Sequence, residues 1–156
     1  MKSMFFAASL AAALALSNTA GAQTPDPSAE VRAVVDQFTQ ALLQKDAARM
    51  GPLFAKDSIV IEGGRLEGSF ETYLHHHLGP ELAEFDSFTV KDRKVSVRQA
   101  GDVAWAYETY GYEVRLKGKP TPLSRLGATT TVLVRTDGAW RIVQLHISSK
   151  APPAKK

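Results

Sequence analysis

The sequence predicts an α+β domain in which helices come first and an antiparallel sheet follows. Three observations support this prediction. Apolar residues recur at helical spacing in the first half of the chain, and they alternate as in strands in the second half. Asp137-Gly138 gives a hairpin signal between the last two alternating segments. A helical half followed by a run of strands is typical of the α+β class.

The helical half opens with a long amphipathic segment. Asp26-Pro27 combines an N-cap acid with a proline at the first helical position. From there an apolar stripe runs from Val31 down to about Lys45. Asp46 can then cap a second, shorter helix.

A short strand at 58–62 and a third helix complete this half. Gly63-Gly64 closes the strand, and Gly68-Ser69 starts the helix. We expect Gly79-Pro80 to interrupt that helix, because proline lacks the N–H that a helix interior needs. The prediction is therefore three N-terminal helices packed on one sheet.

The second half predicts four antiparallel strands, at 87–98, 103–116, 123–135 and 139–148. Two of them are apolar on both faces. In one, Trp105 and Tyr107 oppose Ala104 and Ala106. In the last strand, Trp140 and Ile142 oppose Val143, Leu145 and Ile147. In a sheet with one solvent-exposed face, apolar and polar residues would alternate more regularly along each strand. We therefore expect one face to meet the helices and the other to meet a second copy of the chain, as a homodimer.

The N-terminus has the pattern of a secretory signal peptide. Lys2 precedes the twelve-residue, mainly apolar run Phe5–Leu16, and Ala20-Gly21-Ala22 gives the small-x-small cleavage pattern before Gln23. A membrane-spanning helix needs about 20 apolar residues. The sequence therefore predicts a signal peptide at 1–22, a folded domain at 23–149 and a disordered tail at 150–156. The mature protein is expected to be periplasmic or secreted, and free of the membrane after cleavage.

The composition excludes several classes of function. The chain has no cysteine, which rules out a disulfide framework, a thiolate nucleophile and a cysteine-type metal site. Without Lys2 the basic residues fall from 19 to 18 against 16 acidic ones, a formal charge of +2. No basic stripe with interleaved aromatic residues is present, so nucleic acid is not an expected partner.

The order of these elements resembles the nuclear transport factor 2-like superfamily, and within it the SnoaL-like group. The resemblance is carried by Ala48–Asp57 (ARMGPLFAKD), Glu62–Gly68 (EGGRLEG) and Asp137–Ser148 (DGAWRIVQLHIS). It implies a cone, in which helices close a curved sheet over an interior pocket, and dimers formed through the outer sheet face. The superfamily contains isomerases, dehydratases, cyclases and ligand binders, so the fold does not select a chemistry.

Two histidines are the first candidates for a site. His77 lies on the apolar face of the third helix, and strand alternation places His146 on the same face as Trp140. Both could then enter one pocket, bind a ligand, transfer a proton or bind a metal ion; each could equally be a packing residue. The three consecutive residues His75–His77 fan out by about 100° per residue on a helix, so all three cannot converge on one ion.

Further pocket candidates are Glu62, Tyr73, Arg125, Tyr107 and Trp140. Glu62 ends the first strand, and a buried Arg125 would favour an anionic ligand. The leading hypothesis is an exported domain that binds a small, partly apolar molecule without a cofactor. The alternatives are a cofactor-independent acid–base enzyme, such as an isomerase, lyase or hydrolase, and a periplasmic metal-binding protein that uses the histidine-rich helix.

Overall fold

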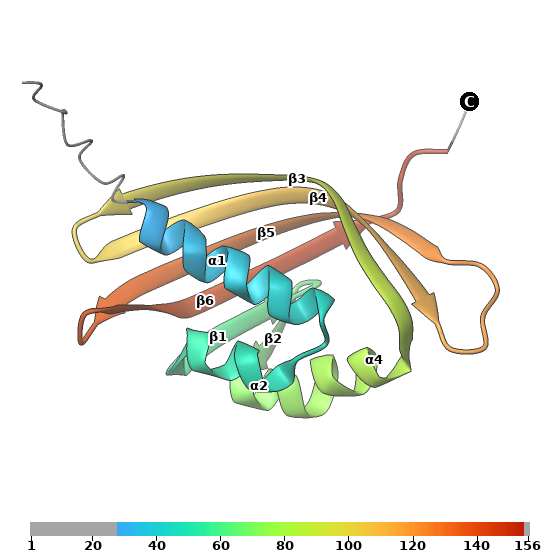
Figure 1. Ribbon diagram of the computed structural model, residues 1–156, viewed down its shortest axis with the longest axis horizontal. Helices are drawn as coiled ribbons and strands as arrows, with labels where there is room; N and C mark the ends of the chain where they lie inside the picture. Colours follow the sequence, from blue (N-terminus) through green and yellow to red (C-terminus); the bar gives the residue numbers. More distant parts are fainter. Residues whose placement is uncertain (1–27, 155–156) are drawn as a thin grey trace, which may run out of the picture.

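A computed structural model describes residues 28–154, and in it helices cover one face of a curved six-stranded sheet (Figure 1). The strand order is β2-β1-β6-β5-β4-β3. The predicted α+β class is confirmed. The predicted signal peptide and the predicted first helix start at Asp26-Pro27 lie outside the described residues. No helix of the described part is long and apolar enough to cross a membrane.

The long helix α1 (Ser28–Leu43) lies diagonally across the sheet (Figure 1). Its buried face consists of Val31, Val35, Phe38 and Ala41, the stripe that helical spacing predicts. The short helix α2 (Ala47–Met50) follows, and the Asp46 carboxylate accepts a hydrogen bond from the Arg49 amide. A 3₁₀ turn, η1 (Gly51–Leu53), then leads into the sheet.

A third helical segment runs without a break from Phe70 to Glu84, as α3 (Phe70–Tyr73), the π-helical turn η2 (Leu74–Leu78) and α4 (Gly79–Glu84). The prediction that Gly79-Pro80 interrupts this helix is wrong. The Gly79 amide donates to the Leu74 carbonyl, five residues back, and this widened turn lets the chain pass the proline. A Cβ on Gly79 would lie 2.6 Å from that carbonyl oxygen, so glycine is needed there.

The sheet contains the predicted strand at 58–62, the four predicted strands of the meander and one strand that was not predicted, β2. The six strands are β1 (Phe54–Glu62), β2 (Arg65–Gly68), β3 (Phe85–Ala100), β4 (Val103–Leu116), β5 (Leu123–Thr136) and β6 (Ala139–Lys150). The sheet is mixed and not purely antiparallel, because β1 pairs with β6 in parallel. Since the chain reaches β6 only after the whole meander, no tight turn forces these two strands to run in opposite directions. β6 extends to Lys150, the first residue of the predicted tail.

A β-bulge divides β6 into two halves. Val132 pairs with Gln144 and Leu133 pairs with Ile142, which leaves Val143 as an extra residue. An extra residue reverses the alternation of side chains beyond it. The apolar residues on both sides of the bulge therefore face the same way, toward the helices.

The bulge overturns a prediction about His146. Trp140 and Ile142 are buried before the bulge and Leu145 is buried after it, so His146 lies on the opposite, exposed face. His146 does not share a face with Trp140. The apparent second apolar face of this strand disappears for the same reason.

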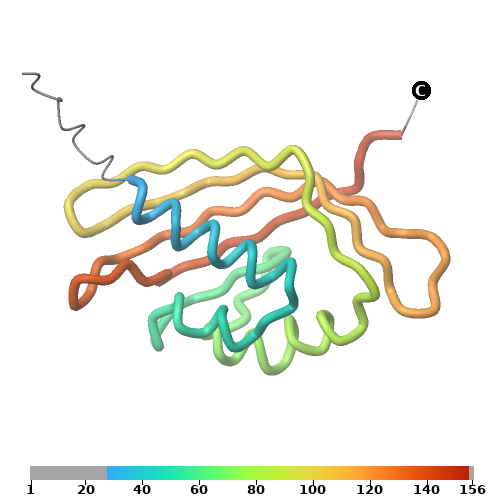
Figure 2. Tube along the Cα trace, viewed as in Figure 1, coloured from blue at the N-terminus to red at the C-terminus, as the bar shows by residue number. Residues whose placement is uncertain are grey.

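A second bulge bends β3. The pairing with β4 shifts between Lys91 and Lys94, and Asp92 has a positive φ of 53°. Figure 2 shows the resulting change of direction, where the chain leaves α4, rises along the edge of the sheet and then runs beside β4. The bulge brings Val90 and Arg93, which are three residues apart, to the same interior space.

Candidate functional site

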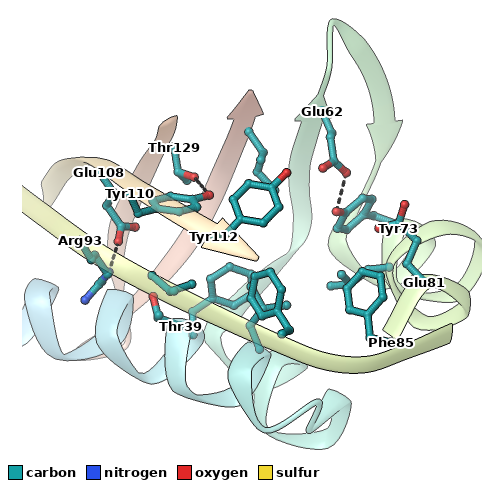
Figure 3. A pocket seen from close by; sticks show the side chains of 16 residues that line it. Thr39, Glu62, Tyr73, Glu81, Phe85, Arg93, Glu108, Tyr110, Tyr112 and Thr129 are labelled. Carbon is teal, nitrogen blue, oxygen red and sulfur yellow. Dashed lines mark hydrogen bonds and ion pairs between the residues drawn. The ribbon is translucent and has the colours of Figure 1, made fainter. Parts of the chain in front are cut away.

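A cavity of about 110 Å³ lies between α1, the third helical segment and the inner face of the sheet (Figure 3). Its middle is apolar and its two ends are polar. The apolar side chains come from helices and strands alike, and they are Phe38, Leu42, Leu78, Phe85, Phe88, Val90 and Ile147. This is the interior pocket that the resemblance implies.

A carboxylate and a phenol form one polar end. The Tyr73 hydroxyl donates a hydrogen bond of 2.6 Å to Glu62 Oε2 (Figure 3). Glu62 ends β1 and is 29% exposed, whereas Tyr73 on α3 is almost fully buried. Burial raises the pKa of Tyr73 far above its usual range, and the negative charge of Glu62 adds to this effect. Tyr73 is therefore a neutral donor that holds the Glu62 carboxylate in place.

His77 lies directly behind this end. Its Nε2 atom is 3.3 Å from Glu81 Oε1 and 3.6 Å from Glu62 Oε2, while its Nδ1 atom is 3.5 Å from Glu67 Oε2. Glu62 and Glu81 line the cavity, but His77 itself does not. Burial raises the pKa of Glu81, although the neighbouring His77 acts in the opposite direction. Three carboxyl groups thus surround one imidazole.

The opposite end of the cavity contains a partly buried ion pair. Arg93 Nε donates to Glu108 at 2.5 Å, and its Nη1 atom donates to Asp36 at 2.6 Å. Burial raises the pKa of Glu108, and Arg93 offsets only part of this rise. Burial disfavours the charge of Arg93, but the hydrogen bond to Asp36 and the charge of Glu108 outweigh it and raise its pKa. The Nη2 atom is buried without a hydrogen-bond partner.

Tyr110 completes this end. Its hydroxyl lies 2.9 Å from Thr129 Oγ1 on the neighbouring strand β5. Burial raises the pKa of Tyr110, and the hydrogen bond with Thr129 partly counteracts the rise. The ring forms part of the cavity wall beside Tyr112 (Figure 3).

The charges that line the cavity are mainly negative. They comprise the carboxyl groups of Glu62, Glu81 and Glu108 and one guanidinium, that of Arg93. Arg93 is already paired with two carboxylates. An anionic ligand would therefore face net repulsion, whereas a neutral or cationic one would not.

The structure brings some of the predicted site residues together and separates others. Glu62 and Tyr73 line the cavity, and His77 lies behind them. His146 is exposed on the outer face of the sheet, so the prediction of a cavity shared by His77 and His146 is wrong. The two residues are also not placed to bind one metal ion.

Three further candidates lie outside the cavity. Tyr107 is 50% exposed, because alternation in β4 puts it opposite the buried Ala106 and Glu108. Trp140 is 4% exposed and belongs to the packed core. Arg125 lines a separate surface hollow between β3, β4, β5 and the end of β6. None of the three can contact a ligand in the cavity.

Several residues of the site were not predicted. Glu108 has a visible signal, because it follows Ala104 and Ala106 on the inward side of β4 and is the only charged residue in that series. Glu81 lies four residues after His77, and the continuous helix makes this spacing meaningful. Arg93 has no such signal, because its inward position depends on the bulge in β3.

Solved structures with the same fold span most of the chain. A proposed ketosteroid isomerase from Shewanella frigidimarina is 27% identical, with a TM-score of 0.65 over 74% of this chain and 92% of that chain. A nuclear transport factor 2-like superfamily protein from Salmonella enterica is 18% identical, with a TM-score of 0.70 over 80% and 92%. A proposed scytalone dehydratase from Novosphingobium aromaticivorans is 12% identical, with a TM-score of 0.66 over 78% and 82%.

The curated proteins give no significant match to this sequence. The family profile described as SnoaL-like domain matches residues 31–152, which include every helix and strand apart from the first turn of α1. The structural neighbours described above share the nuclear transport factor 2-like architecture. The chain therefore belongs to the SnoaL-like domain family, and its fold is that of nuclear transport factor 2-like proteins.

Proposed function

We propose that this domain binds a small, mostly apolar molecule that is uncharged or cationic, in the cavity between α1 and the sheet. The observation that carries the proposal is the cavity itself, with an apolar middle and acidic side chains at both ends. Ligand sites typically combine apolar walls with a few convergent polar groups. Here the polar groups that can meet a ligand are Glu62 at one end and the Arg93–Glu108 pair at the other.

The volume limits the size of the ligand. An engineered protein cavity of about 150 Å³ holds one benzene molecule. At about 110 Å³, this cavity accommodates roughly one ring without rearrangement. A larger ligand would have to place its remaining atoms at the mouth, beside the half-exposed Glu81.

A panel of three single-ring compounds tests this proposal. Benzyl alcohol, benzylamine and benzoate have similar shapes and differ in charge, and their binding is followed by thermal shift and calorimetry. We expect the neutral and cationic compounds to bind at least about tenfold more tightly than the anion. Glu62→Gln should reduce the preference for benzylamine over benzoate, whereas Glu71→Gln, on the exposed side of α3, should leave it unchanged.

Each failure has a separate meaning. If benzoate binds as tightly as benzylamine, the electrostatic part of the proposal is wrong. If none of the three compounds shifts the melting temperature, the cavity does not accept single-ring ligands and the proposed function fails.

The hydrogen bond between Tyr73 and Glu62 favours a second candidate, a cofactor-independent acid–base enzyme. Glu62 is a carboxylate that is fixed in position and still reaches the cavity. A carboxylate so placed can take a proton from carbon and return it to a neighbouring position, as an isomerase requires. The similarity to a proposed ketosteroid isomerase points to the same reaction class.

Cyclohex-3-enone is a single-ring test substrate for this second candidate. Proton transfer from the carbon between carbonyl and alkene to the far alkene carbon gives the conjugated enone, which absorbs more strongly in the ultraviolet. Glu62→Gln should lower the turnover rate by at least about 100-fold, whereas ligand binding should persist. Equal turnover by the wild type and this variant would exclude Glu62 as the base.

We also propose that the chain is exported and that it acts in the periplasm or outside the cell. The support is the charge, length and cleavage pattern of residues 1–22. This segment lies outside the described residues, so the proposal depends on the sequence alone.

A further inference from the structure

Three side chains outside the cavity converge from two elements. Glu67 lies on β2, and His76 and His77 lie on the π-helical turn η2. Glu67 Oε2 is 3.7 Å from His76 Nε2 and 3.5 Å from His77 Nδ1. The three atoms that could act as ligands all lie within 4.8 Å of one another.

The two separations from Glu67 are close to those of a metal site, and the two histidine nitrogens lie within 4.8 Å of each other. Zinc is bound by histidine nitrogen and carboxylate oxygen at about 2.0–2.2 Å, so two ligands of a tetrahedral ion lie roughly 3.4 Å apart. Both measured separations exceed this value by only a few tenths of an ångström. Small side-chain movements would therefore bring the three atoms around one ion.

The burial of Glu67 is an independent observation that points to a cation. Its side chain is only 7% exposed, and its Oε1 atom is buried without a hydrogen-bond partner. Within residues 28–154, its ion pairs are with the two histidines and with no lysine or arginine. A carboxylate buried to this extent needs a positive partner, and a metal ion held together with the two imidazole nitrogens would supply one.

The two histidines present different nitrogens to Glu67, which explains how neighbouring residues converge. His76 approaches with the far nitrogen of its ring, Nε2, and His77 with the near one, Nδ1. Their ring centroids lie 6.3 Å apart. His75 is exposed and takes no part, in agreement with the expectation that three consecutive histidines cannot all face one ion.

The surroundings of His77 suit a metal ligand. Its second nitrogen, Nε2, faces Glu81 at 3.3 Å and Glu62 at 3.6 Å. A histidine that binds a metal usually donates its other ring N–H to a carboxylate or carbonyl oxygen, which fixes the ring and its tautomer. His76 Nε2 is hydrogen-bonded to the Glu67 carbonyl oxygen at 3.2 Å, and ion binding would replace this hydrogen bond.

We propose that Glu67, His76 and His77 bind one divalent transition-metal ion of the zinc, copper or nickel class. Two imidazole nitrogens and one carboxylate oxygen suit these ions, whereas calcium and magnesium prefer ligand sets made of oxygen alone. The site lies behind the Glu62 and Glu81 wall of the cavity, and it does not depend on what the cavity binds.

Zinc titration of the full chain, purified without a histidine tag, tests the proposal by calorimetry. We expect one zinc ion per chain, and no comparable binding of calcium or magnesium. His76→Ala should weaken zinc binding by at least about tenfold, the effect of losing one ligand. His75→Ala is the matched control, because it removes an exposed histidine from the same turn and should leave the affinity unchanged.

Glu67→Gln separates a built site from a run of surface histidines, because it keeps the shape of the side chain and removes its charge. We expect this single variant to bind zinc at least about tenfold more weakly than the wild type, with the fold verified by circular dichroism. Equal weakening by His75→Ala and His76→Ala would overturn the proposal, since it would indicate chelation by the exposed run. A zinc affinity weaker than about 1 mM for the wild type would overturn it as well.

Discussion

Gly127 is the position where a single added methyl group should disturb the cavity wall most directly. It pairs with Tyr110 across β4 and β5, and the tyrosine ring occupies the space that a side chain at Gly127 would need. The same ring continues along β5 to reach Thr129 with its hydroxyl group. The absence of a side chain at Gly127 thus makes room for a tyrosine ring that lines the cavity.

The size of the expected effect follows from the contacts of an added Cβ atom. A Cβ on Gly127 would lie 2.5 Å from Cε2 and 2.7 Å from Cζ of Tyr110, whereas ordinary contacts begin at 3.4 Å. The partly buried ring would have to move by roughly 1 Å, and this movement would strain its hydrogen bond with Thr129. Overpacking of this kind costs about 1–3 kcal/mol. We therefore expect Gly127→Ala to lower the free energy of unfolding by about that amount.

Gly111→Ala is a matched control for this substitution. Gly111 is also a strand glycine, but its added Cβ would meet Lys91 Cγ at 3.2 Å, and the exposed lysine side chain can move away. Replacing a strand glycine with alanine otherwise stabilises a protein by about 0.5–1 kcal/mol. We expect Gly111→Ala to be neutral or slightly stabilising in the same assay.

Urea unfolding of a double-mutant cycle measures the clash itself. Tyr110→Ala removes the ring, so adding Gly127→Ala to that variant should cost little, and the two substitutions should be strongly non-additive. The reasoning is refuted if Gly127→Ala is as stable as Gly111→Ala. It is also refuted if the cost of Gly127→Ala persists in the absence of the ring.

Three further predictions concern pH, assembly and processing. Burial raises the pKa of Tyr110, so the neutral phenol stabilises the fold up to about pH 10, and this contribution is lost as the pH rises through the folded pKa. In urea titrations at alkaline pH, Tyr110→Phe should therefore lose less stability than the wild type, by at most about 1.4 kcal/mol per pH unit. Trp105 and Tyr107 remain exposed on the outer sheet face, and we expect sedimentation to give a dimer that Trp105→Glu dissociates; a monomeric wild type would contradict this. Mass spectrometry of protein from the cell envelope should give Gln23 as the first residue, and a retained Met1 would exclude cleavage.

The sequence by itself determined the type and order of most elements, because these depend on contacts between residues close in the chain. The stripe from Val31 to Ala41 defines the buried face of α1, and Asp46 caps α2 with its own side chain. The positions of Glu62 at the end of β1 and of Tyr73 on the buried side of α3 follow from the same local patterns. These two residues line the cavity.

Only the tertiary structure decided which face several strand residues occupy. Strand alternation assumes an unbroken ladder, and each bulge reverses the alternation beyond it. The bulge at Val143 moves His146 to the outer face, and the bulge at Asp92 brings Arg93 into the cavity. Whether a strand bulges depends on its pairing with a partner strand that local spacing does not describe.

The tertiary structure also decided which carboxyl groups surround His77. Glu67 reaches it from β2, a strand that was not predicted, and Glu81 reaches it because the π-helical turn carries the helix past Pro80. The interrupted helix that proline predicts would have separated His77 from Glu81. Proline removes one hydrogen-bond donor from the helix, and the π-helical turn, in which the Gly79 amide donates to the Leu74 carbonyl, keeps the segment continuous around it.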